Sequence, residues 1–390
     1  MSFAQGRPVI AIPGPSPVPD CVLNAMHRPS PDIYGAELAT ENRRMIAGLK
    51  RLAGTSGHVA PYIGNGHAAW EAANVNLFHR GDLALVLTSG HFGRSWAASA
   101  RALGIEIEEL DFGLAPPDPQ RLAERLARDP DRRIKAVLVC QVDTASSARA
   151  DIPALRAALG DHPAYFAVDA IASLGCEPLL MDDWGIDLLV SASQKGLMVP
   201  PGLALVWVSE RLKAQGSTDL ATPYWDWAPR IAAEELWQFW GGTPPVQHIF
   251  GMNAALDLLL DQETLPRAWA RHEALARATW AALDAWGRDG SGIAPVVADP
   301  AGRARSVTAA TIPNATALRR WTQDKTGVTL GVGLGAADPD AGLRIAHMGH
   351  ANAHHLLGTL AVIEAGMQAL RLPHGAGGIA AAAGIIAELA

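Results

Sequence analysis

The sequence has few cysteines, few charged residues and no long hydrophobic run. Three cysteines, at Cys21, Cys140 and Cys176, are too few for a disulfide framework and fit a reducing compartment, so we expect a cytoplasmic protein. Charged residues make up 18% of the chain and the formal net charge is −7, which argues against nucleic-acid or anionic-membrane partners. We expect no signal peptide, and the weakly polar tail over 375–387 is too short to span a bilayer and predicts a terminal helix.

What the sequence does have is a regular alternation of short apolar runs and helical periodicity. The length of 390 residues suits two domains, and we predict an arm over 1–20, a large domain over 21–262 and a small domain over 263–390. The alternation predicts an α/β fold with a mainly parallel sheet covered on both faces. Predicted strands of the large domain cover 58–63, 83–88, 105–110, 134–140, 165–168, 185–190 and 203–208. Predicted helices include 36–52, 67–78, 94–103, 119–127, 152–159, 246–260 and 265–286.

The two ends of the chain carry different patterns. Residues 10–20 are too rich in proline for a regular element and predict an extended arm that leads into a helix with Asp20 as its N-cap. The small domain is predicted to be α+β. Its elements are strand 307–312, helix 315–326, strands 328–332 and 343–347, and helix 353–370.

A lysine, Lys195, ends the short stretch of small residues over 191–195, between the apolar runs 185–190 and 203–208. An isolated ammonium taken out of water is costly, so such a group neutralises or finds a partner. A lysine with a lowered pKa is a nucleophile that can hold an aldehyde cofactor as a Schiff base. The alternative is a surface lysine at a strand end, and the spacing alone leaves both interpretations open.

Two further charged residues follow or occupy apolar strands. Asp169 comes directly after a buried strand, where a carboxylate can keep a pyridine nitrogen protonated; it could also cap a turn or a helix. One strand unit separates it from Lys195, so both are expected at the same edge of the sheet. Arg344 is centred in an apolar strand and can clamp a substrate carboxylate, or it can form a structural ion pair.

Polar turns follow two other strands. The turn 64–67 precedes a helix whose N-terminal N–H groups can bind phosphate. It also satisfies a loose dinucleotide pattern, but that pattern needs an acid after the next strand, and Asp82 precedes this strand as a turn residue. Thr144, after the strand 134–140, can hydrogen-bond a ring hydroxyl or a phosphate, or simply form a turn.

The tryptophan-rich stretch 218–242 predicts either core packing or an interface or active-site wall. The histidines near the C-terminus lack the spacing of a metal site.

The stretch 186–204 resembles the pyridoxal-phosphate attachment signature of the class V aminotransferases. Nearly the whole chain is similar to this family, most of all to its alanine–glyoxylate and serine–glyoxylate branch. The resemblance implies a fold type I enzyme with a mainly parallel seven-stranded sheet and a small C-terminal α+β domain. It implies a homodimer with shared active sites that moves an amino group from a small amino acid (serine, alanine or an aspartate-like donor) to a small 2-oxo acid, in the first place glyoxylate.

The resemblance also implies roles for single residues. Lys195 is the expected catalytic residue, which holds the cofactor and then moves the substrate proton. The expected cofactor-binding residues are Gly66, His67, Phe92, Thr144, Asp169, Ile171, Gln194, Lys195, Trp240 and, from the other subunit, Thr243. Arg344, Tyr34 and Gly35 are the expected substrate-binding residues, and no metal is expected. Three positions depart from the family: Phe92 replaces a tryptophan, Trp240 a tyrosine, and Asn65 stands inside the glycine turn.

Other reactions on the same scaffold stay open at this stage. One is a pyruvate-dependent transamination of another amine, such as pyridoxamine or an aminophosphonate; another is a lyase or desulfurase reaction. A desulfurase needs a reactive cysteine on a loop far along the chain, whereas the last cysteine here is Cys176. A nicotinamide-dependent oxidoreductase that uses the turn 64–67, and a non-catalytic binding protein, are the remaining alternatives.

Overall fold

The large sheet has the predicted composition of seven mainly parallel strands. The computed structural model describes residues 1–335 and 338–390. Strand β10 is antiparallel to its neighbours β2 and β9, and the other strands all run in one direction. In spatial order the strands are β2 (His58–Gly64), β10 (Gly202–Val208), β9 (Leu188–Ala192), β8 (Tyr165–Asp169), β5 (Ile134–Cys140), β3 (Leu83–Thr88) and β4 (Glu106–Asp111).

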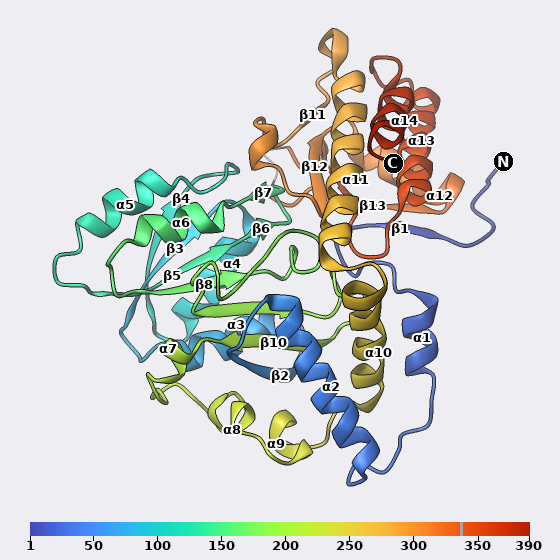
Figure 1. Ribbon diagram of the computed structural model, residues 1–390. Helices are drawn as coiled ribbons and strands as arrows, with labels where there is room; N and C mark the ends of the chain where they lie inside the picture. Colours follow the sequence, from blue (N-terminus) through green and yellow to red (C-terminus); the bar gives the residue numbers. More distant parts are fainter. Residues whose placement is uncertain (336–337) are drawn as a thin grey trace.

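Helices cover both faces of this sheet (Figure 1). Successive strand residues alternate between two apolar cores, as in Val137 and Leu138 of β5. One core joins the sheet to α2 (Ala36–Ala53), α5 (Pro119–Ala127), α6 (Ile152–Leu159) and α10 (Val246–Asp257). The other core joins it to α3 (Gly66–Leu77) and α4 (His91–Ala102). Burial on both faces explains why the inner strands are almost entirely apolar, whereas the edge strand β4 has no buried residue and carries three glutamates and an aspartate.

A second sheet gathers the C-terminal strands and, unexpectedly, the N-terminal arm. Its order is β1 (Val9–Ala11), β13 (Val328–Val332), β14 (Gly342–Ala346), β12 (Val307–Thr311) and β11 (Ala294–Pro295). The prediction that the arm has no regular element is wrong at its start, because Val9–Ala11 precedes the prolines and pairs in parallel with β13. Asp20 is the first residue of α1 (Asp20–Met26) and not its N-cap, which is Pro19.

Four helices pack around this second sheet, seen in orange and red in Figure 1. They are α11 (Leu265–Trp286), α12 (Ala315–Thr326), α13 (Ala353–Ala369) and α14 (Gly378–Leu389). The C-terminal tail therefore forms the predicted helix, which packs along α11. The domain boundaries at 20 and 262 stay predictions.

The remaining elements are short. They are the hairpin strands β6 (Val142–Asp143) and β7 (Ala148–Arg149), the helices α7 (Glu210–Lys213), α8 (Ala228–Ile231) and α9 (Leu236–Trp240), a π-helical turn (Leu258–Gln262) and 3-10 turns at Arg288–Gly290 and Pro300–Gly302. None of the helices in the described part of the chain is long and apolar enough to cross a membrane.

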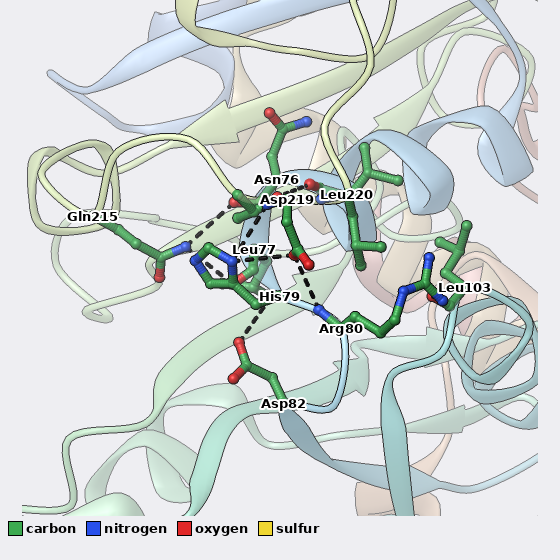
Figure 2. Close-up of polar contacts among 11 residues, drawn as sticks. Asn76, Leu77, His79, Arg80, Asp82, Leu103, Gln215, Asp219 and Leu220 are labelled. Carbon is green, nitrogen blue, oxygen red and sulfur yellow. Dashed lines mark hydrogen bonds and ion pairs between the residues drawn. The ribbon is translucent and has the colours of Figure 1, made fainter.

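Asp82 acts as a turn residue at the start of β3, as predicted. Figure 2 shows its carboxylate beside His79, whose backbone N–H donates to Asp82 Oδ2 at 2.8 Å. The His79 ring contacts Asp219 Oδ1 at 3.1 Å, and Gln215 donates to the carbonyl of Leu77 at 3.1 Å. These contacts fix the loop around Asp219 to the amino end of β3, opposite the strand ends that carry the predicted site.

Candidate active site

A cavity of about 270 Å³ lies at the carboxyl ends of β8 and β9. Asp169 is the last residue of β8, and Lys195 follows the end of β9 by a short turn. The parallel pairing of these strands brings both residues to one edge of the sheet, as the spacing predicts. The predicted cofactor residues that line the cavity are Gly66, His67, Phe92, Thr144, Asp169, Ile171, Gln194 and Lys195.

The Lys195 amine is held between the arm and the sheet. Nζ donates a hydrogen bond to the carbonyl of Pro13, and a Cβ atom at Gly14 would lie 2.7 Å from Nζ. Gly14 has φ 117°, so this close approach requires glycine for both space and backbone. Burial and the nearby Arg344 guanidinium lower the Lys195 pKa to about 8, against the opposing charges of Asp169 and Asp143. A larger neutral fraction makes this amine a better nucleophile near neutral pH.

Asp169 is buried and accepts from three donors, of which the Cys140 thiol, 3.7 Å from Oδ2, is the weakest. Oδ1 accepts from the Ile171 N–H at 2.7 Å, and Oδ2 accepts from the Trp70 indole at 2.8 Å. Burial raises the Asp169 pKa to about 6, although these hydrogen bonds favour the charged form. A cationic ring nitrogen in the cavity would give this carboxylate a partner of opposite charge and would stabilise its ionised form. Sequence reasoning missed Trp70, because an apolar aromatic inside α3 is typical of a core residue.

The Trp70 ring is itself fixed by a second tryptophan. It stacks on Trp96 of α4 with centroids 6.2 Å apart and an interplanar angle of 8°. The Trp96 indole donates to Asn74 Oδ1 at 3.0 Å. The orientation of Asp169 is thus supported from α3 and α4 together.

At the N-terminus of α3 the cavity offers backbone donors. Asn65 caps this helix, since its Oδ1 accepts from the His67 N–H at 3.0 Å. The N–H groups of Gly66 and Ala68 make no hydrogen bond within the described structure. A Cβ atom at Gly66 would lie 2.6 Å from Ile171 Cδ1, so the glycine makes room for the isoleucine that lines the cavity. Such a helix terminus suits a phosphate group.

Two more residues shape the cavity wall. Asp143 is fully buried and accepts from the backbone N–H groups of Phe92 at 2.8 Å and Gly93 at 3.0 Å, which fixes Phe92 against the cavity. Gln194 Oε1 is buried without a hydrogen-bond partner among the described residues. An unpaired buried acceptor beside a cavity indicates that a bound group donates to it.

Arg344 lines a larger neighbouring cavity of about 600 Å³, which shares Gly14, Phe92 and Lys195 with the first. Its Nε donates to the Val332 carbonyl at 2.6 Å and its Nη1 to the Thr144 carbonyl at 3.0 Å. The side chain is buried, and burial lowers its pKa to about 10. It forms no ion pair in the part of the chain that the structure describes, so the alternative of a structural ion pair is not supported.

Four predicted site residues line neither cavity. Trp240 is buried in α9 and donates its indole N–H to Asn42 Oδ1 at 2.9 Å, so this N–H is not available to a phosphate. Thr243 is exposed on the loop after α9, Tyr34 is 90% exposed, and Gly35 is the N-cap of α2. In the tryptophan-rich stretch, core packing therefore holds for Trp240 and Trp227.

Comparison with known proteins defines the class of protein. The family described as aminotransferase class-V matches residues 13–317, and the chain belongs to this family. It is 30% identical to the serine–glyoxylate aminotransferase of Arabidopsis thaliana over 371 residues, which cover 93% of this chain and 90% of the relative. It is 31% identical to the L-aspartate–glyoxylate aminotransferase of Paracoccus denitrificans over 383 residues, or 96% of this chain and 94% of the relative. A crystal structure of pyridoxamine–pyruvate aminotransferase from Mesorhizobium loti superposes with TM-score 0.90 and 26% identity, with all of both chains covered.

The protein is thus a fold type I, pyridoxal-phosphate-dependent transaminase, as the signature around Lys195 predicts. The residues present fit this cofactor: an amine with a lowered pKa, a buried carboxylate for the ring nitrogen and the unpaired N–H of Gly66 at a helix terminus belong to residues that line one cavity. When bound, the cofactor supplies an electron sink for the bonds at the substrate Cα.

Proposed function

We propose that this enzyme transfers an amino group from a small amino acid to a small 2-oxo acid, with glyoxylate as the favoured acceptor. The observation that carries the proposal is the position of Lys195, which lines both the cavity of Asp169 and the cavity of Arg344. The printed names of the serine–glyoxylate and aspartate–glyoxylate relatives support the choice of acceptor.

In this proposal the tasks are divided among four residues. Lys195 Nζ would hold the cofactor and, as the free amine, could take the proton from the substrate Cα. Asp169 would keep the ring nitrogen of the cofactor charged, and Phe92 would contribute an aromatic wall to the cofactor cavity. Arg344 binds the substrate carboxylate through the hydrogens that Val332 and Thr144 leave free. Placing carboxylate, Cα and amine together provides much of the rate through orientation.

We also propose a cytoplasmic homodimer with shared active sites. Large apolar side chains are exposed at Tyr34 (90%), Trp237 (58%), Ile63 (45%) and Leu23 (45%), and an interface with a second copy of the chain would remove them from water. An interface over these residues would also give Thr243 and Tyr34 a place at the partner's site. Light scattering with size-exclusion chromatography tests this, since a monomeric mass at micromolar concentration would contradict it.

The experiment on function is a spectral half-reaction screen of the purified holoenzyme. Each amino acid is added alone and the loss of the visible absorption of the lysine-bound cofactor is followed. A panel of 2-oxo acids is then tested for recovery of that absorption. We expect small amino acids to bleach the band and glyoxylate to restore it fastest. Bleaching by no amino acid, or fastest recovery with a large 2-oxo acid, would contradict the proposal.

Pyridoxamine with pyruvate forms the second arm of this screen. The indole of Trp240, a residue expected to bind the cofactor, already donates to Asn42, and the Asn65 side chain inside the glycine turn already accepts from the His67 N–H. This favours testing a ring substrate without phosphate, as in the pyridoxamine–pyruvate relative. A desulfurase reaction is not favoured, because Cys140 and Cys176 are buried, burial raises the pKa of both thiols, and neither they nor Cys21 lines the cavity.

A further inference from the structure

The larger cavity carries more positive charge than a single substrate carboxylate requires. Besides Arg344 it is lined by Arg319 and Arg320 of α12. Neither of these two arginines forms an ion pair in the described part of the chain, even though Asp324 follows on the same helix. Three arginines therefore line this cavity, of which Arg320 is exposed, and no carboxylate of the described residues lines it with them.

The contacts of Arg319 point to a missing partner. Its Nη2 donates to Thr316 Oγ1 at 3.0 Å, whereas its Nε is buried and has no hydrogen-bond partner among the described residues. A buried donor left unpaired costs free energy, and a bound anion would satisfy it. Gln323, one turn further along α12, also lines the cavity and adds a second kind of polar group.

The position of these arginines relative to Lys195 limits what the anion can be. The two cavities share Gly14, Phe92 and Lys195, so a substrate held near the Lys195 amine extends from the smaller cavity into the larger one. Arg344 is one residue that can take its α-carboxylate. The walls formed by α12 and β13 then face the substrate side chain, and the uncompensated charge there favours a side chain of negative charge.

We propose that the larger cavity selects an amino donor with a second carboxylate, a short dicarboxylic amino acid such as aspartate or glutamate. Arg344 holds the α-carboxylate, and Arg319 and Arg320 hold the distal one. Serine or alanine would fill little of the volume of about 600 Å³ and would leave both α12 arginines unpaired. This inference rests on the proposed transamination and narrows its donor.

The first test uses the unaltered holoenzyme and three donors. The rate of the spectral half-reaction is measured at sub-saturating aspartate, asparagine and alanine. Asparagine matches aspartate in shape but lacks the distal charge, so aspartate is expected to react roughly tenfold to a hundredfold faster, the range for a hydrogen bond to a charged group. Added salt should reduce this preference. Equal rates for aspartate and asparagine would overturn the inference.

The second test assigns the preference to α12. Arg319→Gln and Arg320→Gln should each lower the ratio of kcat/KM for aspartate to that for alanine by roughly tenfold or more. Lys325→Gln is the matched control. This substitution removes the same charge from the same helix, but Lys325 lines neither cavity. An unchanged ratio in both arginine variants, or an equal drop in Lys325→Gln, would contradict the assignment.

The two proposals fail in different ways. If alanine and serine bleach the cofactor absorption while aspartate shows no advantage over asparagine, the transaminase stands and the dicarboxylate inference falls. If no amino acid bleaches it, the proposed function itself falls. Should an arginine variant not fold, judged by thermal unfolding, the donor comparison on the unaltered enzyme still decides.

Discussion

The two cavities that meet at Lys195 differ in size, charge and origin. The smaller one has a single buried carboxylate, Asp169, and backbone donors at a helix terminus, and it is built largely from turns that follow strands of the large sheet. The larger one has three arginines and is built mostly from α12 and the strands of the second sheet. The first matches what every reaction with this cofactor needs, whereas the second is the one that we propose selects the substrate.

Removing the residue that both cavities share should have the largest effect. Lys195→Ala loses the amine that holds the cofactor and moves the proton, so turnover should fall by at least roughly a thousandfold. The measurement is the steady-state rate together with the visible spectrum. Lys213→Ala, which changes a lysine outside both cavities, should keep both. Normal turnover in Lys195→Ala would rule out the proposed role.

The next largest effect should come from the smaller cavity. Asp169→Asn cannot keep the ring nitrogen charged and turns an amide N–H₂ toward the donors of Trp70 or Ile171. We expect kcat for every donor to fall by roughly a hundredfold or more, since proton transfer at Cα depends on the charged ring. Comparison of several donors checks this, because a loss confined to one donor would mean that Asp169 acts on substrate choice.

Arg344→Gln should weaken substrate binding and leave cofactor binding intact. Loss of a charge-assisted hydrogen bond predicts a rise in KM of roughly tenfold to a hundredfold. The visible spectrum of the bound cofactor serves as the internal control. Arg344→Lys should recover part of the loss through its charge. A fall in kcat at unchanged KM would contradict the division of tasks between the cavities.

A pH titration should reveal the coupling between the cavities. Only the unprotonated amine attacks the cofactor, so the rate of cofactor capture by the apoenzyme should rise with pH to a midpoint near 8, the lowered pKa of Lys195. The positive charge of Arg344 helps to lower this pKa, and Arg344→Gln should therefore move the midpoint upward. A midpoint near the ordinary lysine value of 10.5 in the unaltered protein would contradict the account.

The smallest effect should come from the support of Asp169. Trp70→Phe removes one hydrogen bond to the carboxylate and should lower the free energy of unfolding by about 1–3 kcal/mol. It should also raise the Asp169 pKa further, because this bond favours the charged form. Urea unfolding measures the first effect. Trp184→Phe, which removes an indole without a hydrogen-bond partner among the described residues, is the matched control and should change stability less.

The contrast between the cavities also explains what the sequence could predict. Asp169 and Lys195 follow apolar runs, and the rule that ligands bind beyond strand ends placed both at one edge. Arg319 and Arg320 lie on an amphipathic helix, where charged residues are the usual solvated face, so no pattern distinguished them. The resemblance assigned Trp240 to the cofactor site. In the structure its indole N–H donates to Asn42, a contact between α9 and α2 that sequence spacing cannot reveal.

The same limit applies to the fold. The large sheet was predictable because its inner strands are buried on both faces, and helices 119–127 and 152–159 have the predicted bounds. The strand β1 could not be predicted, because its three residues, which lie before a proline-rich run, are held in a strand by pairing with β13. Its location matters for function, since Pro13 and Gly14 directly after it contact the Lys195 amine.

Chemical trapping of the cofactor is the most direct test of the central claim. The holoenzyme is reduced with borohydride, digested with a protease and analysed by mass spectrometry. The account predicts one pyridoxyl-phosphate label, on the peptide that contains Lys195. A label on Lys50, Lys135, Lys213 or Lys325 instead, or no label at all, would contradict it.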